Sequence, residues 1–421
     1  MNRVNFLGSV ALAAAVPAAP SSPAALSAAR AAMPLAGAPH PISPCDWNKQ
    51  SETVNPNRRT ALVLSGGIAQ GVYEAGVVKS LLANGYKFDV ICGTSIGALN
   101  GAMIAQGDHT LLEHTWTTLA SKPIKKFERH ARLIFDAVGA LRTDGLAVGN
   151  RYVVPIVEFF LAYDGGKIAA LQGVFDPAGA QSVLRPLDLR KIVTPFMFAV
   201  TNVNVGQGQA IYAGRPGEDP PKFDEGSDVP VDTLDFSNQD HVSLYPEAVR
   251  ASGALPLAFA PIPLRGLNTA STVKAPHFFS DGGVANNTPV RLARKLGVTD
   301  IICVFMAPRV SAASASTPQT IVDSLLKLYT ANQNQLLDDE ILLALQNRNS
   351  LQRSERNADS VPEKKEDRLI NIYEVRPSSD IGVDSLAFDD QAALDYGFMR
   401  GVEDGKKYPV PYPPPVSPVV A

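Results

Sequence analysis

The 421-residue sequence predicts an α/β fold, because three short apolar runs read as strands and each ends in a turn that contains glycine. A helical pattern follows each turn, so strands and helices alternate along the chain. The strands are expected over residues 60–64, 89–92 and 277–280. In open parallel sheets, ligands bind beyond the carboxyl ends of the strands. If the three strands are neighbours, the residues that follow them converge on one crevice.

The first turn spans residues 65–71 and has the sequence SGGIAQG. Backbone N–H groups in such a turn can stabilise an anion, either a phosphate or a developing oxyanion. The spacing fits neither the dinucleotide pattern GxGxxG nor the nucleotide pattern GK[ST]. We therefore expect an oxyanion hole, with N–H donors from Gly66, Gly67 and Ile68 and a further one from Ile96.

The second turn, residues 93–97 with the sequence GTSIG, matches the nucleophile-elbow pattern GxSxG. A serine between a strand and a helix is lifted out of the sheet, and the helix N-terminus favours negative charge nearby. Gly93 and Gly97 permit so sharp a turn because they carry no side chain. We expect Ser95 to be a nucleophile, and the alternative is an ordinary glycine-rich turn without chemistry.

The third turn carries Asp281, which ends the strand over residues 277–280 and precedes two glycines. An aspartate before glycine often only bonds its own backbone, and that structural role is the alternative here. A carboxylate in the same crevice as Ser95 can instead act as a general base. Ser95 would then attack an ester carbonyl while Asp281 accepts its proton, and water would release the acyl group.

Together the three turns resemble those of the patatin-like lipid acyl hydrolases. The segments ASGALP at residues 251–256 and AVTNVNVG at residues 199–206 are similar to further segments of that family, and the resemblance covers most of residues 57–405. It implies a three-layer patatin-like fold, with a mainly parallel central sheet and helices on both faces. It also implies a catalytic dyad of Ser95 and Asp281 that hydrolyses carboxylic esters of membrane lipids, as a phospholipase A does, without a metal or other cofactor.

Two residues depart from the family pattern. Ile68 stands where a third glycine usually lies, and Gln70 replaces the usual lysine or arginine. The loop still offers an N–H at Ile68, but without the cation the sequence predicts no preference among lipid head groups. These departures motivate one alternative, a lipid-binding pseudoenzyme that keeps the fold without turnover.

A Ser-His-Asp carboxylesterase is the other alternative. The α/β-hydrolases order their triad as serine, acid and histidine, and no histidine follows Asp281 in this chain. A triad would need His241 or His277 as its base, with an acid earlier in the sequence. His277 begins the apolar strand that leads to Asp281, which favours a place at the strand edge, so we prefer the dyad.

The flanking segments differ in composition from the centre. Residues 1–45 are rich in alanine and proline and predict either a signal peptide or a disordered leader. Residues 408–421 predict a proline-rich, extended tail, and residues 57–405 between them predict one catalytic domain. A signal peptide would export the protein to a bacterial-type cell envelope, as a periplasmic or membrane-associated protein, or would lead to its secretion.

Charge and cysteine content exclude several function classes. A net charge of -3 and the lack of an aromatic-basic motif argue against nucleic-acid binding. Three cysteines without paired spacing predict neither a disulfide framework nor a zinc site. The expected partner is a membrane lipid or lipid ester, reached by peripheral membrane contact because no run is apolar enough to span a bilayer. A basic helical pattern over residues 122–142 predicts an interfacial lid or a solvated helix face.

Overall fold

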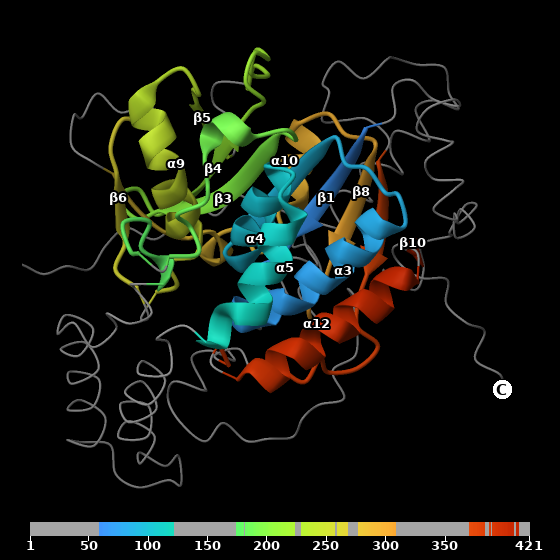
Figure 1. Cartoon of the computed structure of the whole chain (residues 1–421). Coiled ribbons are helices and arrows are strands. Elements are labelled where there is room, and N and C mark those ends of the chain that lie inside the picture. The colour runs from blue at the N-terminus through green and yellow to red at the C-terminus, as the bar shows by residue number, and fades with distance from the viewer. Residues whose placement is uncertain are drawn as a thin grey trace, which may run out of the picture. The chain divides into compact units, whose positions relative to one another are not determined.

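A ten-stranded mixed sheet organises the described part of this computed structural model (Figure 1). The structure describes residues 59–121, 174–180, 182–223, 229–256, 259–267, 277–308, 370–383, 387–388, 390–407 and 410–411. All of them belong to one unit, Pro41–Pro414. The predicted leader, the basic pattern over residues 122–142 and most of the proline-rich tail lie outside these residues.

The central strands of the sheet are parallel. The strands are β1 (Thr60–Leu64), β2 (Val90–Thr94), β3 (Phe196–Asn202), β4 (Gln207–Ala213), β5 (Val231–Leu234), β6 (Ile262–Leu264), β7 (His277–Asp281), β8 (Asp300–Val304), β9 (Asn371–Val375) and β10 (Val410–Pro411). Their order is β10-β9-β8-β1-β2-β3-β4-β5, and β7 pairs with both β3 and β6. Strands β9, β8, β1, β2 and β3 run in one direction, whereas β4, β7 and β10 are antiparallel to their neighbours in this group.

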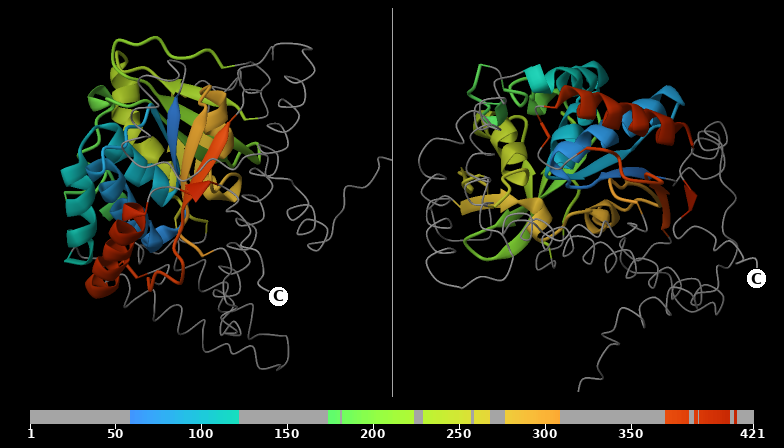
Figure 2. Two further views of the ribbon diagram at one scale, coloured as in Figure 1. Left: turned by 90° about the vertical axis from the view of Figure 1, so that its right-hand side faces the viewer. Right: turned by 90° about the horizontal axis from the view of Figure 1, so that it is seen from below.

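Helices cover both faces of the sheet. They are α3 (Gly71–Ala83), α4 (Ile96–Ala105), α5 (His109–Thr118), α9 (Gln239–Ser252), α10 (Val290–Lys295) and α12 (Gln391–Lys406). Short 3-10 helices are η2 (Ile68–Gln70), η3 (Leu119–Ser121), η4 (Leu189–Lys191) and η5 (Gly282–Val284). Figure 2 shows α3, α5 and α12 on one side of the sheet and α10 on the other. The predicted α/β fold with a mainly parallel sheet is confirmed.

The core sits in the middle of the sheet. Every residue of β1, β2 and β8 is buried, as expected of parallel strands that are covered on both faces. Cys92 and Cys303 lie within these strands and are buried free thiols. Burial raises the pKa of the Cys92 thiol, so this cysteine is an unreactive packing residue.

Helix α12 packs along α3, which is almost entirely buried (Figure 1). Between the two helices the Tyr73 hydroxyl donates a hydrogen bond to Asp404 Oδ2 at 3.1 Å. Asp404 also forms an ion pair with Lys407 at 2.7 Å. Burial, together with the neighbouring Asp404 carboxylate, raises the pKa of Tyr73. This polar contact holds the C-terminal helix against the helix that follows β1.

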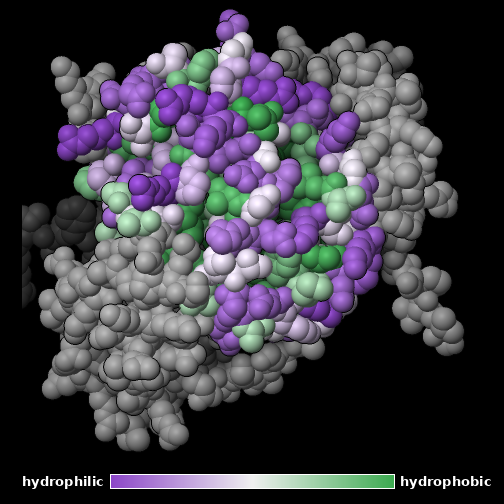
Figure 3. Space-filling view, viewed as in Figure 1, coloured by the Kyte–Doolittle hydropathy of each residue, from purple (hydrophilic) through white to green (hydrophobic). Residues whose placement is uncertain are grey.

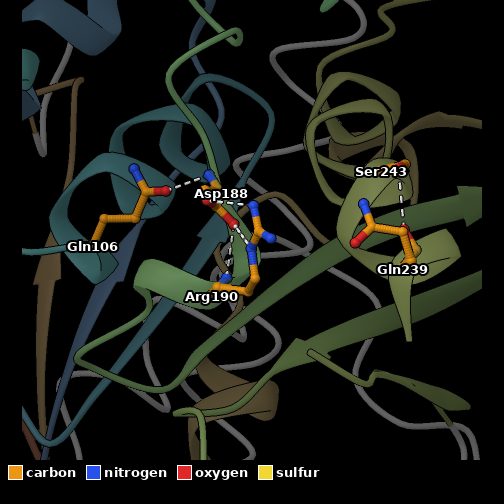
Figure 4. A network of polar contacts seen from close by, with 5 residues as sticks. All are labelled: Gln106, Asp188, Arg190, Gln239 and Ser243. Carbon is orange, nitrogen blue, oxygen red and sulfur yellow. Dashed lines mark hydrogen bonds and ion pairs between the residues drawn. The ribbon is translucent and has the colours of Figure 1, made fainter. Parts of the chain in front are cut away.

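Polar contacts around Asp188 connect the end of α4 to the chain that enters β3 (Figure 4). The Asp188 N–H donates to Gln106 Oε1 at the end of α4. Asp188 Oδ1 accepts from the N–H and the Nε–H of Arg190, each at 3.0 Å, and this caps η4. The guanidinium lowers the pKa of Asp188. The chain segment that leads into strand β3 is therefore bonded to the end of α4.

Figure 4 also shows a contact within α9, where Ser243 Oγ donates a hydrogen bond to Gln239 O one turn earlier at 3.0 Å.

The last described residues of the chain belong to the sheet. The described tail residues, Val410–Pro411, form β10 and pair antiparallel with β9, so the predicted extended tail begins as an edge strand. Among the described residues, no helix is both long and apolar enough to cross a membrane.

Candidate active site

Ser95 lies in a strained turn between β2 and α4. Its φ of 55° and ψ of -123° are unusual for a residue other than glycine. Such strain persists only where neighbouring contacts hold it. The Ser95 N–H donates to Ser252 Oγ at 2.9 Å, and the Ser95 carbonyl accepts the first helical hydrogen bonds of α4. The turn therefore has the geometry that the nucleophile-elbow pattern predicts.

The glycines on either side of Ser95 allow the backbone to pack closely. A Cβ at Gly97 would lie 2.6 Å from the carbonyl oxygens of both Leu64 and Ser65, at the end of β1. A Cβ at Gly93 would lie 2.5 Å from the Gly97 oxygen. Side chains do not fit at these positions because the obstacles are backbone atoms, which cannot rotate away. The two glycines thus bring the N-terminus of α4 against the end of β1.

Asp281 reaches Ser95 because β2 and β7 share one edge of β3. The last residue of β2, Thr94, pairs with Ala199, and Asp281 at the end of β7 pairs with Val200. Since β7 runs antiparallel to β3 while β2 runs parallel to it, the carboxyl ends of the two strands meet. The Ser95 hydroxyl donates a hydrogen bond to Asp281 Oδ2 at 2.6 Å.

The Asp281 carboxylate is held on its other side as well. Its Oδ1 accepts the Gly283 N–H at 2.7 Å, which is the Asp-Gly turn contact that the sequence offered as the structural alternative. The carboxylate makes this turn contact and the Ser95 contact at once, one with each oxygen. With only 2% of Asp281 exposed, its orientation toward Ser95 is fixed by the surrounding chain.

The segment around Ser252 connects the two residues, and sequence reasoning missed this role. Ser252 Oγ accepts the Ser95 N–H and donates to Ala199 O at 2.7 Å, while Ala254 O accepts the Asp281 N–H at 2.9 Å. In the sequence, the segment ASGALP is informative only through its similarity to the family. Nothing in its local sequence signals a hydrogen bond to a residue 157 positions away.

The glycine-rich turn differs from the prediction at Gly66. The Gly66 N–H donates to Asn287 O at 3.0 Å, so Gly66 is wrong as an oxyanion-hole donor. Its lack of a side chain matters instead, because a Cβ there would lie 2.3 Å from Asn287 Oδ1 and 3.2 Å from Ser95 Cβ. No described residue accepts a hydrogen bond from the N–H groups of Gly67, Ile68 or Ile96.

The two departures from the family pattern are Ile68, which has an unusual backbone conformation, and Gln70, which makes a hydrogen bond within the fold. Ile68 has a φ of 56°, in the left-handed region that strongly disfavours β-branched residues. Gln70 Nε2 donates to Val383 O at 3.2 Å and so connects the turn to the segment that precedes α12. Gln70, which replaces the usual lysine or arginine, therefore has a structural role.

The described histidines do not contact Ser95. His241 Nδ1 accepts the Asp235 N–H at 2.9 Å in an exposed loop contact, and His277 Nδ1 lies 3.0 Å from Asn202 Nδ2. His277 begins β7 and Asp281 ends it, so the strand separates the histidine from the site. The described part of the chain also holds no group of three or more histidine, cysteine or acidic side chains placed to bind a metal ion.

The surface of the helical face is mixed. In Figure 3, hydrophobic residues lie among hydrophilic ones over the face that Figure 1 shows with α3, α5 and α12 in front. Larger exposed hydrophobic residues lie just after β3 and near the start of β7, at the end of that strand away from Asp281. They are Val203, Val205 and Phe278, with exposed fractions of 48%, 60% and 42%.

Comparisons with known proteins agree with the motifs. The sequence pattern of the family described as patatin-like phospholipases matches residues 62–294, which is more than half of the chain. A lysophospholipase nte1 of Aspergillus terreus is 51% identical over 49 residues, or 12% of this chain and 3% of that protein. A patatin-like phospholipase domain-containing protein of Chaetomium globosum is 55% identical over 47 residues, or 11% of this chain and 6% of that protein.

Among solved structures, VipD from Legionella pneumophila is similar, with a TM-score of 0.34 and 13% sequence identity over 85% of this chain and 68% of that one. The chain thus matches only small parts of its curated relatives, but the family pattern covers the strands and turns that build the candidate site. The chain belongs to the patatin-like phospholipase family.

Proposed function

We propose that the chain is a serine hydrolase that cleaves carboxylic esters of membrane lipids through the dyad of Ser95 and Asp281. One observation carries the proposal, the 2.6 Å hydrogen bond from the Ser95 hydroxyl to Asp281 Oδ2 in a strained strand-to-helix turn. A nucleophile in direct contact with its base is the arrangement that acyl transfer requires. Family membership supports an acyl ester of a lipid as the substrate.

The first half of the reaction forms an acyl-enzyme. Ser95 Oγ attacks the ester carbonyl carbon, its proton passes to Asp281 Oδ2, and the carbonyl oxygen becomes an oxyanion. The N–H groups of Gly67, Ile68 and Ile96, which no described residue accepts, are the candidate donors to that oxyanion. The bond to the alcohol oxygen then breaks, and the lysolipid leaves with the proton from Asp281.

The second half of the reaction restores the enzyme. A water molecule gives its proton to Asp281 and attacks the acyl carbonyl, again through an oxyanion at the same donors. The bond to Ser95 Oγ breaks, the fatty acid leaves, and Ser95 regains its proton from Asp281.

Exposed apolar residues on and beside the strand that carries Asp281 support a lipid at a membrane surface as the substrate. Val203 and Phe278 lie side by side, since the Val203 N–H donates to Phe278 O at 2.9 Å, and both are exposed at the start of β7, the strand that ends at Asp281. Transfer of exposed apolar side chains of this kind from water to a lipid surface lowers the free energy of the system. If the leader is a signal peptide, export to a cell envelope would bring the protein to such surfaces.

Labelling and hydrolysis together test the proposal. The full chain should react with a fluorophosphonate at Ser95 and release p-nitrophenol from a short-chain ester. Both reactions should fall by about 1000-fold or more in Ser95→Ala, and hydrolysis should fall similarly in Asp281→Asn. Ser243→Ala, which removes a hydroxyl that bonds only within α9, is the matched control and should remain active.

The substrate class is tested with vesicles of phosphatidylcholine or phosphatidylglycerol and with triacylglycerol emulsions, and the products are identified by mass spectrometry. Release of fatty acid that depends on Ser95 supports the proposal. Full activity in Ser95→Ala, or a fluorophosphonate label on another residue, would rule it out. Loss of activity in His241→Ala or His277→Ala would favour a triad.

A further inference from the structure

Glu74 is a buried carboxyl group that the proposed mechanism does not use. It lies in the first turns of α3, directly after the glycine-rich turn, and none of its surface is exposed. No lysine, arginine or histidine of the described chain forms an ion pair with it. Burial of a carboxyl group without a cation is unfavourable, so its hydrogen bonds have to explain its place.

Both carboxyl oxygens of Glu74 accept hydrogen bonds from groups near the site. Oε1 accepts the Ser65 N–H at 2.7 Å, and Oε2 accepts Asn100 Nδ2 at 3.1 Å. Ser65 directly follows β1, which ends at Leu64, and is the first residue of the glycine-rich turn. Asn100 lies on α4, five positions after Ser95. Glu74 thus connects the beginning of the turn to the helix that carries the nucleophile.

The orientation of the Asn100 amide is fixed by Trp116. The indole Nε1–H of Trp116 can only donate, and it lies 2.9 Å from Asn100 Oδ1. The other end of the amide is therefore the NH₂ group, which donates to Gly71 O at 2.9 Å and to Glu74. Ser65 and Gly71 are the two ends of the glycine-rich turn, so this network holds both of them.

We propose that Glu74 is a positioning residue, which together with Asn100 holds the glycine-rich turn so that the N–H groups of Gly67 and Ile68 face the substrate carbonyl beside Ser95. The proposal rests on the function proposed above. The two amides lie between the anchored ends of the turn, and no described residue accepts their hydrogen bonds. Donors to an oxyanion are effective only when they are held in place before the reaction.

The variant Glu74→Gln tests this role because glutamine has one acceptor oxygen where glutamate has two. One of the two donors, the Ser65 N–H or Asn100 Nδ2, must then face an NH₂ group. We expect the kcat for the p-nitrophenyl ester to fall by about 10-fold to 100-fold, with KM within about threefold of the wild-type value, because the substrate still binds but the oxyanion donors move.

Asp404→Asn is the matched control. Asp404 is also a buried carboxyl group that contacts α3, through the Tyr73 hydroxyl, but it lies away from the glycine-rich turn. This variant is expected to lower stability while it keeps the kcat of the wild type. If both variants lose kcat in proportion to their loss of stability, Glu74 has a merely structural role and the proposal is wrong.

Amide hydrogen exchange separates this proposal from the proposed function, because it needs no activity. The amide hydrogens of a peptide that spans residues 62–72 should exchange about tenfold faster in Glu74→Gln than in the wild type. In Asp404→Asn their exchange rate should equal that of the wild type. Unchanged exchange in Glu74→Gln overturns the positioning role even if Ser95→Ala is inactive. Faster exchange in an enzyme whose Ser95→Ala variant keeps full activity would instead refute the dyad.

A second variant keeps the test valid if Glu74→Gln does not fold. Glu74→Met removes the buried polar group at similar length, and the absence of a carboxyl group to desolvate offsets part of the cost of the two unpaired donors. It leaves both donors without an acceptor, so it should show the same loss of kcat and the same faster exchange. A wild-type kcat in a folded Glu74→Met would overturn the proposal.

Discussion

The two strand-to-helix turns at the site, β1 to α3 and β2 to α4, contain the two described non-glycine residues with positive φ, yet they use this conformation differently. At Ser95 the strained residue is bonded on all sides, by Ser252 at its N–H and by Asp281 at its hydroxyl. At Ile68 no described residue accepts the N–H. The first turn thus presents amides and the second presents a hydroxyl. Similar local geometry supplies two different parts of one site.

The largest effect is expected where the two turns touch. In Gly97→Ala the new Cβ would lie 2.6 Å from the carbonyl oxygens of Leu64 and Ser65, so one of the turns must move. We expect a loss of about 3 kcal/mol in the free energy of unfolding and at least about 100-fold in kcat. Urea unfolding and ester hydrolysis measure the two losses.

Gly253→Ala is the control for this glycine, because a Cβ there meets nothing closer than 3.7 Å. It should change the free energy of unfolding by less than about 1 kcal/mol. Equal losses in the two variants would show that the contact between the turns is not special.

A smaller effect is expected at the contact that distinguishes the Ser95 turn. Ser252→Ala removes the acceptor of the Ser95 N–H and leaves Ala199 O without its hydroxyl donor. We expect kcat to fall by about 10-fold to 100-fold and the free energy of unfolding by about 1 to 3 kcal/mol. Steady-state kinetics with a calorimetric melting curve measures both, and an unchanged kcat would show that the elbow holds its shape without Ser252.

The first turn should respond to pH through Glu74. Burial raises the pKa of Glu74 well above its usual range, and the hydrogen bonds from Asn100 and Ser65 only partly oppose this. The folded protein then keeps a proton that the unfolded chain loses above a pH of about 4.3. Stability is therefore fully present below that pH and is lost as the pH rises through the folded pKa, by at most about 1.4 kcal/mol per pH unit.

Urea unfolding of the wild type and of Glu74→Gln from pH 4.5 to 8.5 measures how the contribution of Glu74 to the free energy of unfolding depends on pH. The stability advantage of the wild type over the variant should shrink as the pH rises, because the variant has no proton to lose at this position. A constant difference across the range would mean that Glu74 keeps an ordinary pKa in the fold.

The smallest effect is expected at Ile68. In Ile68→Gly, relief of the left-handed strain, about 1 to 2 kcal/mol, offsets the lost packing and the extra flexibility of the unfolded chain. The free energy of unfolding should stay within about 1 kcal/mol of the wild type, and kcat within about threefold. Ile68→Ala, which keeps the strain without the packing, should be the less stable of the two. A tenfold loss of kcat in Ile68→Gly would assign the isoleucine side chain a part in catalysis.

The sequence could predict those parts of the site that one continuous stretch defines. Ser95 follows its strand and precedes its helix, so a local pattern contains its whole turn. The antiparallel direction of β7 could not be predicted, because pairing with β3 depends on residues about 80 positions away. The error at Gly66 has the same origin, since its N–H is taken by Asn287, which lies 221 positions further along the chain. Ser252 was missed because the group that it holds is also distant in sequence.

The head-to-head meeting of β2 and β7 on neighbouring residues of β3 has a consequence for how this protein can change. The spacing of hydroxyl and carboxylate is set by one step along the β3 backbone, from Ala199 to Val200. Long connections leave and rejoin the sheet between Ser95 and Asp281 in sequence, and apart from the segment Ser252–Ala254, which bonds to both residues, they are not part of that pairing. Insertions and deletions in the connections can therefore reshape what surrounds the substrate while the reacting atoms stay in register.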